Sequence, residues 1–143
     1  MKNKLKTILL IDDDTPTNYY HEVILQDANC TENVVIQYSS DRALDYFRAL
    51  KNNNLPFPEL VFLDMNMPGW DGFEFIEMLQ TFFPSTKDKM KIVILTSLPE
   101  APSLQEIELS NQIIGVKSKP LTEKVVWDLI QTHFSSNSSL VTL

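Results

Sequence analysis

The chain of 143 residues has little cysteine, no long hydrophobic run and a deficit of basic side chains. Its one cysteine, Cys30, excludes an intrachain disulfide and a cysteine-based metal cluster, and we interpret it as a small apolar side chain in a reducing compartment. The apolar residues after the basic start of the chain end at Asp12, too soon for a signal peptide or a membrane span. We therefore expect a cytoplasmic protein that no membrane anchors.

Acidic side chains outnumber basic ones by 19 to 12, which gives a formal net charge of -7. A surface of that sign repels phosphate backbones and anionic lipid, so we expect neither nucleic acid nor a membrane as a partner. Clustered acids have a second use, since several carboxylates at one site attract a hard cation. The length and the hydrophobic fraction of 43% predict a single domain over residues 1–143, with a core over about residues 6–134 and a flexible, Ser-rich tail over 135–143.

Short apolar segments alternate along the chain with longer amphipathic segments. The apolar segments predict strands at residues 7–11, 33–38, 60–63, 92–95 and 113–116. The amphipathic segments predict helices from a Thr15 cap to about 28, from a Ser39 or Ser40 cap to about 50, across 75–83, over 104–112 and from a Thr122 cap to about 134. In the first helix the apolar residues Tyr20, Val23, Ile24 and Ala28 recur at helical spacing.

An apolar strand followed by a helix, five times over, predicts an α/β fold with a parallel sheet and helices on both faces. Right-handed crossovers allow only a few windings of such a sheet. We expect the flavodoxin-like, doubly wound one, with five strands in the order 2-1-3-4-5 and five helices.

Polar residues stand where four of the predicted strands end. Asp12 and Asp13 end the first strand, Asp64 the third and Thr96 the fourth, and Lys119 follows the fifth. Because the carboxyl ends of parallel strands share one edge of the sheet, we expect these side chains to converge there.

Three crowded carboxylates repel one another, and Mg²⁺, which prefers oxygen ligands, relieves that repulsion. Lys119 adds a compact positive charge, and Thr96 adds a hydroxyl donor. The set fits attack by a carboxylate on phosphorus, which produces an acyl phosphate.

Four motifs occur in order at these strand ends. They are Ile8-Leu9-Leu10-Ile11-Asp12-Asp13-Asp14, Leu63-Asp64-Met65-Asn66-Met67-Pro68-Gly69-Trp70-Asp71-Gly72, Val93-Ile94-Leu95-Thr96-Ser97 and Lys119-Pro120. With them, from about residue 6 to 134, the chain resembles the receiver domains of two-component systems, the CheY-like family, in their stand-alone form. The resemblance implies that Asp64 accepts a phosphoryl group from a histidine kinase or a histidine phosphotransfer protein. It implies a signalling domain that is modified itself and is not an enzyme acting on a separate substrate.

The resemblance also implies a role for each site residue. Mg²⁺ is bound by Asp13, Asp64 and the backbone carbonyl of Asn66, with Asp12 assisting, while Thr96 and Lys119 act on the phosphoryl group together with Asp64. The peptide before Pro120 is often cis in the family.

The family also implies a switch that changes how partners bind. Thr96 is expected to move toward the phosphoryl group. Val116 stands where many members have an aromatic residue that moves with the threonine, so this chain lacks that part of the switch. An unidentified downstream protein is the expected target of the face formed by the fourth helix, the fifth strand and the fifth helix. A homodimer through that face is an open alternative.

Two rival functions use some of the same residues. Asp12, Asp14 and Thr15 mimic the opening of haloacid-dehalogenase-type phosphatases, but the glycine after the second aspartate, a late acidic pair and room for a cap domain are missing. A degenerate receiver, which binds partners without phosphorylation, is opposed by the intact set of site residues and favoured only by Val116. We expect Asp14 at the start of a helix. We expect His21 and His133 at or near the surface, and we assign them no role.

Overall fold

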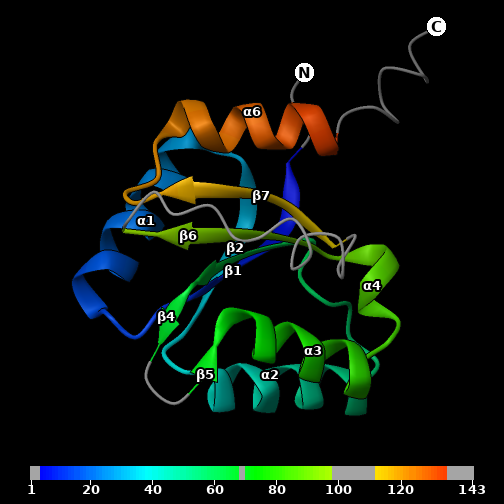
Figure 1. Cartoon of the computed structure of the whole chain (residues 1–143). Helices are drawn as coiled ribbons and strands as arrows, with labels where there is room; N and C mark the ends of the chain where they lie inside the picture. The colour runs from blue at the N-terminus through cyan, green and yellow to red at the C-terminus, as the bar shows by residue number, and fades with distance from the viewer. Residues whose placement is uncertain (1–3, 68–69, 98–111, 135–143) are drawn as a thin grey trace, which may run out of the picture.

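The computed structural model describes residues 4–67, 70–97 and 112–134 (Figure 1). The strands are β1 (Leu5–Ile11), β2 (Thr31–Gln37), β3 (Leu60–Asp64), β4 (Asn66–Met67), β5 (Trp70–Asp71), β6 (Lys91–Thr96) and β7 (Ile113–Ser118). The helices are α1 (Thr15–Ala28), α2 (Ser40–Asn52), α3 (Gly72–Phe82), α4 (Thr86–Lys89) and α6 (Glu123–His133).

Five of these strands form one parallel sheet in the order β2-β1-β3-β6-β7. They are the five strands that the sequence predicts, so the doubly wound order 2-1-3-4-5 is confirmed. The described residues form five helices, but α4 is a single turn that the sequence analysis did not predict. The helix expected over 104–112 lies outside the described residues. The remaining two strands, β4 and β5, pair antiparallel directly after β3.

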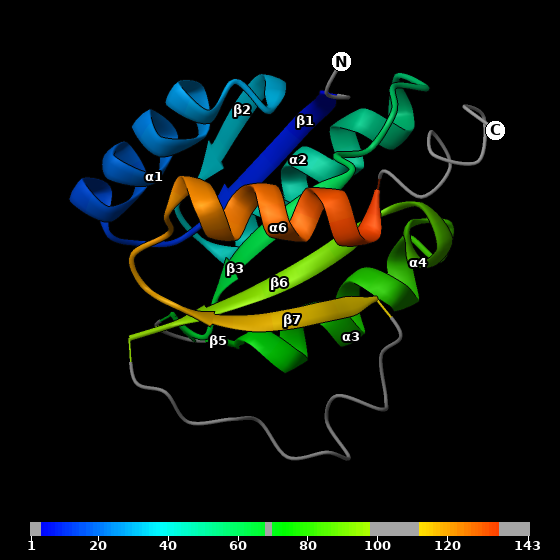
Figure 2. The same cartoon turned by 90° about the horizontal axis from the view of Figure 1, so that it is seen from above.

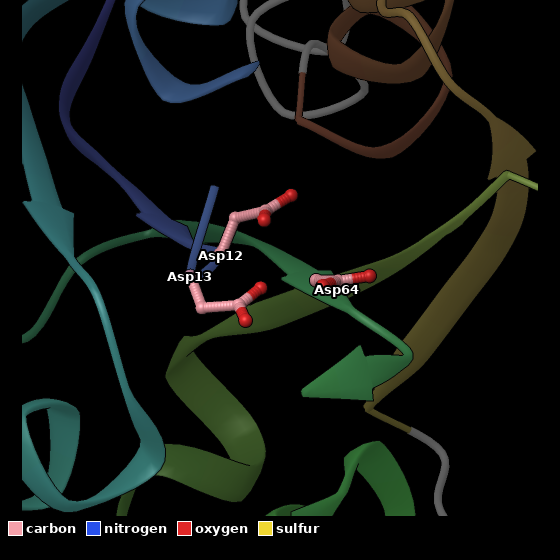
Figure 3. A group of neighbouring side chains, drawn as sticks. All are labelled: Asp12, Asp13 and Asp64. Atoms are coloured by element: carbon pink, nitrogen blue, oxygen red, sulfur yellow. The ribbon is translucent and has the colours of Figure 1, made fainter. Parts of the chain in front are cut away.

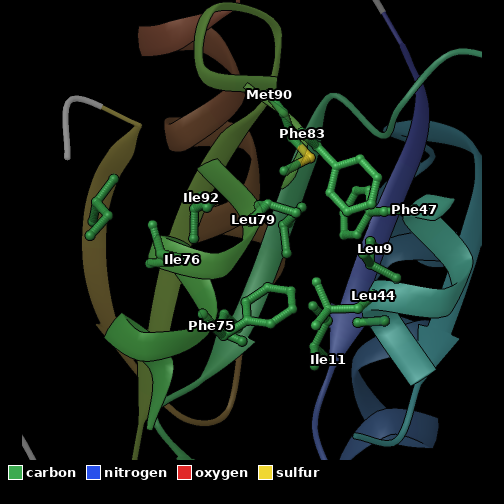
Figure 4. Packing of buried hydrophobic residues seen from close by; sticks show 14 of the residues in the cluster. Leu9, Ile11, Leu44, Phe47, Phe75, Ile76, Leu79, Phe83, Met90 and Ile92 are labelled. Carbon is green, nitrogen blue, oxygen red and sulfur yellow. The ribbon is translucent and has the colours of Figure 1, made fainter. Parts of the chain in front are cut away.

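Helices cover both faces of the sheet, with α1 and α6 on one face and α2 and α3 on the other (Figures 1 and 2). Alternate residues of each strand serve the two faces. Leu9 and Ile11 of β1 pack with Phe47 of α2 in one buried cluster, part of which Figure 4 shows. Ile8 and Leu10 belong to a second cluster on the other face. The middle residues of the central strands are therefore all apolar, as parallel strands buried on both faces require.

Side-chain caps begin three of the helices. Ser39 Oγ accepts from Arg42 N at 3.1 Å, and Thr122 Oγ1 accepts from Val125 N at 3.2 Å, as the sequence predicts. The prediction that Thr15 caps α1 is wrong, because Thr15 is already helical and Asp14 accepts from Thr17 N at 3.0 Å. Asp14 is thus the residue that starts the helix.

The buried face of α1 also differs from the prediction. It carries Asn18, His21, Leu25 and Ala28, whereas Tyr20 is 47% exposed. The expectation that His21 lies at or near the surface is wrong, since its ring is 1% exposed against the loop that leads into α6. None of the described helices combines the length and the apolar character that crossing a bilayer requires.

Candidate functional site

The carboxyl ends of β1, β3, β6 and β7 bring the polar residues of the four motifs to one edge of the sheet. Asp64 is the last residue of β3 and pairs in register with Leu95 of β6, while Thr96 pairs with Ser118 of β7. The backbone N–H of Lys119 then donates to Thr96 O at 2.9 Å, so the residue after β7 is fixed against the end of β6. The convergence expected from the parallel sheet is what the structure shows.

Three carboxylates form the centre of this edge. Asp12 and Asp13 lie at the end of β1 and Asp64 at the end of β3 (Figure 3). Each offers one carboxylate oxygen, and these oxygens lie within 4.8 Å of one another. Asp12 and Asp64 are buried at 3% and 5% exposure, whereas Asp13 is exposed. An all-oxygen donor set that is open to solvent on one side suits a hard divalent cation that keeps some of its waters.

Lys119 supplies the positive charge of the site. Its Nζ lies 2.7 Å from Asp12 Oδ2 and 3.1 Å from Asp64 Oδ1, and its side chain is only 17% exposed. Burial by itself lowers the pKa of Lys119, but the hydrogen bonds and the charges of Asp12 and Asp64 outweigh burial and raise the pKa above its ordinary value. The ammonium therefore stays charged between the two carboxylates at neutral pH.

Hydrogen bonds hold both the side chain and the backbone of Asp12. Its Oδ1 accepts from Asp14 N at 2.9 Å, and its Oδ2 accepts from Lys119. Its backbone N–H donates to Gln37 O at 3.2 Å, and its backbone carbonyl accepts from Asn18 Nδ2 at 2.8 Å. Both carboxylate oxygens of Asp12 are thus engaged within the protein, which makes Asp12 the fixed anchor of the lysine.

Asp14 has a different task, although it lies next to the cluster. Hydrogen bonds from the hydroxyl and the backbone N–H of Thr17 lower the pKa of its carboxyl. Among the described residues, the group that could hold a metal contains Asp12, Asp13 and Asp64 but not Asp14. Asp14 therefore caps the helix, as expected, and is not part of the acidic cluster.

The remaining predicted residues surround this centre. Thr96 is 7% exposed at the end of β6, and the backbone of Asn66 follows Asp64 closely as the first residue of β4. The Lys119-Pro120 peptide is cis, as the family resemblance implies. Val116 is half-buried against the cluster that packs between the sheet and α2 and α3.

Sequence reasoning missed two residues of the site's surroundings, Asn18 and His21. Asn18 Nδ2 binds the backbone of Asp12, and His21 Nε2 accepts from Leu121 N at 3.2 Å. A pocket of about 520 Å³ opens beside Lys119, between α1 and the loop after β7. Its lining includes Pro16, Tyr20, His21, Ser97, Lys119 and Pro120.

Comparisons with known proteins point to one family. The profile of the response regulator receiver domain matches residues 8–131. Among solved structures, the chain is similar to a two component response regulator from Cytophaga hutchinsonii, with 27% identity and a TM-score of 0.83 over 91% of this chain and 97% of that one. A search of curated protein sequences finds no match.

More distant structures share the fold. The chemotaxis response regulator CheY4 of Vibrio cholerae is 22% identical, with a TM-score of 0.70 over 90% of this chain and 98% of that one. A response regulator receiver protein from Dyadobacter fermentans is 21% identical, with a TM-score of 0.74 over 89% of this chain and 96% of that one. With the family profile covering most of the chain and the acidic cluster at the matching strand ends, this protein belongs to the response regulator receiver domains of two-component signal transduction.

Proposed function

We propose that Asp64 accepts a phosphoryl group from a phosphohistidine of a histidine kinase or a histidine phosphotransfer protein, in a reaction that requires Mg²⁺. The observation that carries this proposal is the position of Lys119 Nζ, 2.7 Å from Asp12 and 3.1 Å from Asp64, beside a third carboxylate. A buried carboxylate next to a fixed ammonium and a cation site has the neighbours that an acyl phosphate needs.

The residues around Asp64 would form the Mg²⁺ site. Asp13, Asp64 and the backbone carbonyl of Asn66 would hold Mg²⁺, with Asp12 assisting. When bound, Mg²⁺ would offset the negative charge of the carboxylates and of the phosphoryl oxygens.

An Asp64 oxygen attacks phosphorus, the P–N bond of the phosphohistidine breaks, and its electron pair stays on the imidazole nitrogen. Lys119 and the hydroxyl of Thr96 donate hydrogen bonds to the phosphoryl oxygens. The protein transfers the group to itself and has no separate substrate that it turns over.

Phosphorylation then changes which partners bind. The acyl phosphate shifts an existing equilibrium, with Thr96 moving toward the new group. Val116 is not aromatic, so this chain lacks the aromatic side chain that moves with the threonine in many members of the family. The expected contact face for a cytoplasmic protein target, or for a second copy of the chain, includes β7 and α6.

The phosphatase alternative assigns the nucleophile to Asp12. Both oxygens of that carboxylate already accept hydrogen bonds, one from Asp14 N and one from Lys119, and the side chain is buried. A carboxylate held this way is poorly placed to attack a substrate, which argues against Asp12 as the nucleophile.

Intact mass after incubation with acetyl phosphate tests the proposal. The wild type should gain one phosphoryl mass with Mg²⁺ and none without it, and Asp64→Asn should gain none. Asp45→Asn, which changes an exposed carboxylate on α2, is the matched control and should behave as the wild type. No gain in the wild type would favour the degenerate receiver. A gain that survives Asp64→Asn but is lost in Asp12→Asn would favour the phosphatase.

A further inference from the structure

A buried histidine holds the loop that carries Lys119. His21 lies on α1 and is 1% exposed, and its Nε2 accepts the backbone N–H of Leu121 at 3.2 Å. Leu121 is itself fully buried, at 0% exposure, so its N–H cannot donate to water instead. An imidazole nitrogen that accepts a hydrogen bond carries no proton, so this contact requires the neutral ring with its proton on Nδ1.

The loop after β7 is tied down at two backbone points. Lys119 N donates to Thr96 O at 2.9 Å, and Leu121 N donates to His21. Pro120 stands between them and has no N–H of its own. The direction in which the Lys119 side chain leaves the backbone therefore depends on both anchors.

The same helix also holds the other partner of the ion pair. Asn18, three residues before His21 and on the same buried face, donates from Nδ2 to the backbone carbonyl of Asp12 at 2.8 Å. Residues three apart on a helix lie side by side. One face of α1 thus fixes the backbone of Asp12 and the backbone that follows Lys119. The side chains of these two residues are in contact, with Lys119 Nζ 2.7 Å from Asp12 Oδ2.

We propose that His21 is a positioning residue, which fixes Leu121 so that Lys119 Nζ reaches both Asp12 and Asp64. This inference rests on the proposed function, because it concerns how fast Asp64 is phosphorylated. It also makes a claim that does not need phosphorylation, since Lys119 competes with a divalent cation for the same carboxylates.

The electrostatic setting of His21 agrees with an acceptor role. Burial lowers the pKa of His21, the negative charge of Asp12 raises it, and the positive charge of Lys119 lowers it, with a net shift downward. The ring is therefore neutral at pH 7, as the contact with Leu121 requires.

A matched pair of variants separates the effect of losing the hydrogen-bond acceptor at position 21 from the effect of changing the shape of the side chain. His21→Gln supplies an oxygen acceptor, and His21→Met has a side chain of the same length whose thioether is only a weak acceptor. His133→Met, at the end of α6, controls for the loss of a histidine elsewhere. Two quantities are measured on each variant: the rate of phosphorylation by acetyl phosphate with Mg²⁺, by intact mass, and the dissociation constant of Mg²⁺ alone, by calorimetry.

If His21 positions Lys119, the two quantities change in opposite senses in His21→Met. Phosphorylation slows by about tenfold to a hundredfold, because a misplacement of about 1 Å costs up to that much. Mg²⁺ binds several-fold more tightly, because the ammonium no longer neutralises the carboxylates. His21→Gln restores both, and His133→Met changes neither. Adding His21→Met to Lys119→Met produces no further change, since residues that act through one contact are not additive.

Other results overturn the inference. One is a phosphorylation rate and a Mg²⁺ affinity in His21→Met that equal those of the wild type, and another is a Mg²⁺ affinity that falls together with the rate. A third is an equal change of both quantities in His133→Met. The last is that His21→Met changes both quantities as much in the Lys119→Met background as in the wild type. If His21→Met does not fold, as judged by circular dichroism, His21→Phe replaces it as the ring without an acceptor. If the wild type is not phosphorylated at all, the proposed function fails, but the Mg²⁺ affinities still decide the inference, and an absence of Mg²⁺ binding in every variant counts against it.

Discussion

The ion pairs at the carboxyl edge of the sheet and those on the outer faces of the helices have similar N–O distances but differ in their exposure to solvent. On α2, Arg48 lies 2.8 Å from Asp45, and on α6, Lys124 lies 2.9 Å from Asp128, with every side chain more than half exposed. At the sheet edge, Lys119 lies 2.7 Å from Asp12, but these side chains are only 17% and 5% exposed.

Distance alone therefore does not separate the pairs, whereas burial does. Exposed pairs three or four residues apart on a helix contribute a few tenths of a kcal/mol and are screened by salt. A buried pair costs desolvation energy that its attraction only partly offsets, so its retention points to a role other than stability. Asp12 and Lys119 are 107 residues apart in the chain, and their contact joins the first strand of the sheet to the loop after the last one.

The largest expected effect follows from removing the half-buried ammonium of Lys119. Lys119→Met should lower the rate of phosphorylation by acetyl phosphate by about 10²–10³-fold, the usual loss when one fixed donor at a developing charge is removed. Lys124→Met, which removes an exposed ammonium from α6, should leave the rate unchanged. Intact-mass time courses of both variants make the measurement. Equal rates in Lys119→Met and the wild type would show that the buried pair has no part in the chemistry.

Removing a buried amide should have the next largest effect, this time on stability. Asn18→Ala leaves the buried carbonyl of Asp12 without its donor, and we expect the free energy of unfolding to fall by about 1–3 kcal/mol in urea. The control is Asn53→Ala, because Asn53 Nδ2 makes a bond of the same length, 2.8 Å, to Ala49 O at the exposed end of α2. That change should cost less than about 0.5 kcal/mol. Similar losses in the two variants would mean that burial does not set the difference.

Replacing Asn18 with leucine separates the two hydrogen-bonding atoms of its amide. Within the described part of the chain, Asn18 Oδ1 is buried and has no hydrogen-bond partner, which is a cost that the native side chain carries. Asn18→Leu removes that oxygen and fills most of the space, so it should destabilise the protein less than Asn18→Ala does.

The sequence predicts the sheet well because periodicity and apolar runs report directly on burial. All five strands of the parallel sheet were expected, and the convergence of Asp12, Asp64, Thr96 and Lys119 follows from parallel strands alone. The ends of elements were predicted less well, as with Thr15 and Asp14, since capping depends on one hydrogen bond that adjacent residues could each make.

The buried polar face of α1 could not be predicted from apolar spacing. Asn18, His21, Leu25 and Ala28 keep the helical period, but two of the four are polar, and the neighbouring Tyr20 offered a more apolar alternative. What places His21 inside is its contact with Leu121, 100 residues away in the chain, and no local pattern encodes that contact. The sequence did contain one indication of this face. Asn18 and His21 lie at helical spacing from the apolar Leu25 and Ala28, on a helix that follows the acidic motif.

Acidification should weaken the fold through this same buried face. Burial lowers the pKa of His21 from an ordinary value of 6.5, so the unfolded chain takes up a proton at a higher pH than the folded protein does. The stability that His21 contributes is thus present above pH 6.5 and is lost as the pH falls toward the lowered folded value. One such group gives a slope of at most about 1.4 kcal/mol per pH unit.

Urea unfolding of the wild type and His21→Gln at several values between pH 7 and pH 5 measures this slope. His21→Gln should reduce it, because glutamine does not titrate. His133 also has a lowered pKa, through burial and the charges of Lys91 and Lys117, but its side chain is less buried. His133→Gln should therefore reduce the slope less, and the opposite ranking would place the pH sensitivity on α6.

The smallest effect should come from the exposed pair on α6. Lys124→Gln removes a pair with Asp128 whose side chains are 84% and 60% exposed, and we expect a loss of about 0.3–0.5 kcal/mol in the free energy of unfolding at low salt. At about 1 M salt, where the screening length is about 3 Å, that difference should vanish. The effect of Lys119→Met on phosphorylation should persist at the same ionic strength, because buried charges are screened far less. A Lys119 effect that disappears with salt in parallel with that of Lys124 would mean that solvent reaches both pairs alike, and the contrast between the sheet edge and the helix surface would then have no physical basis.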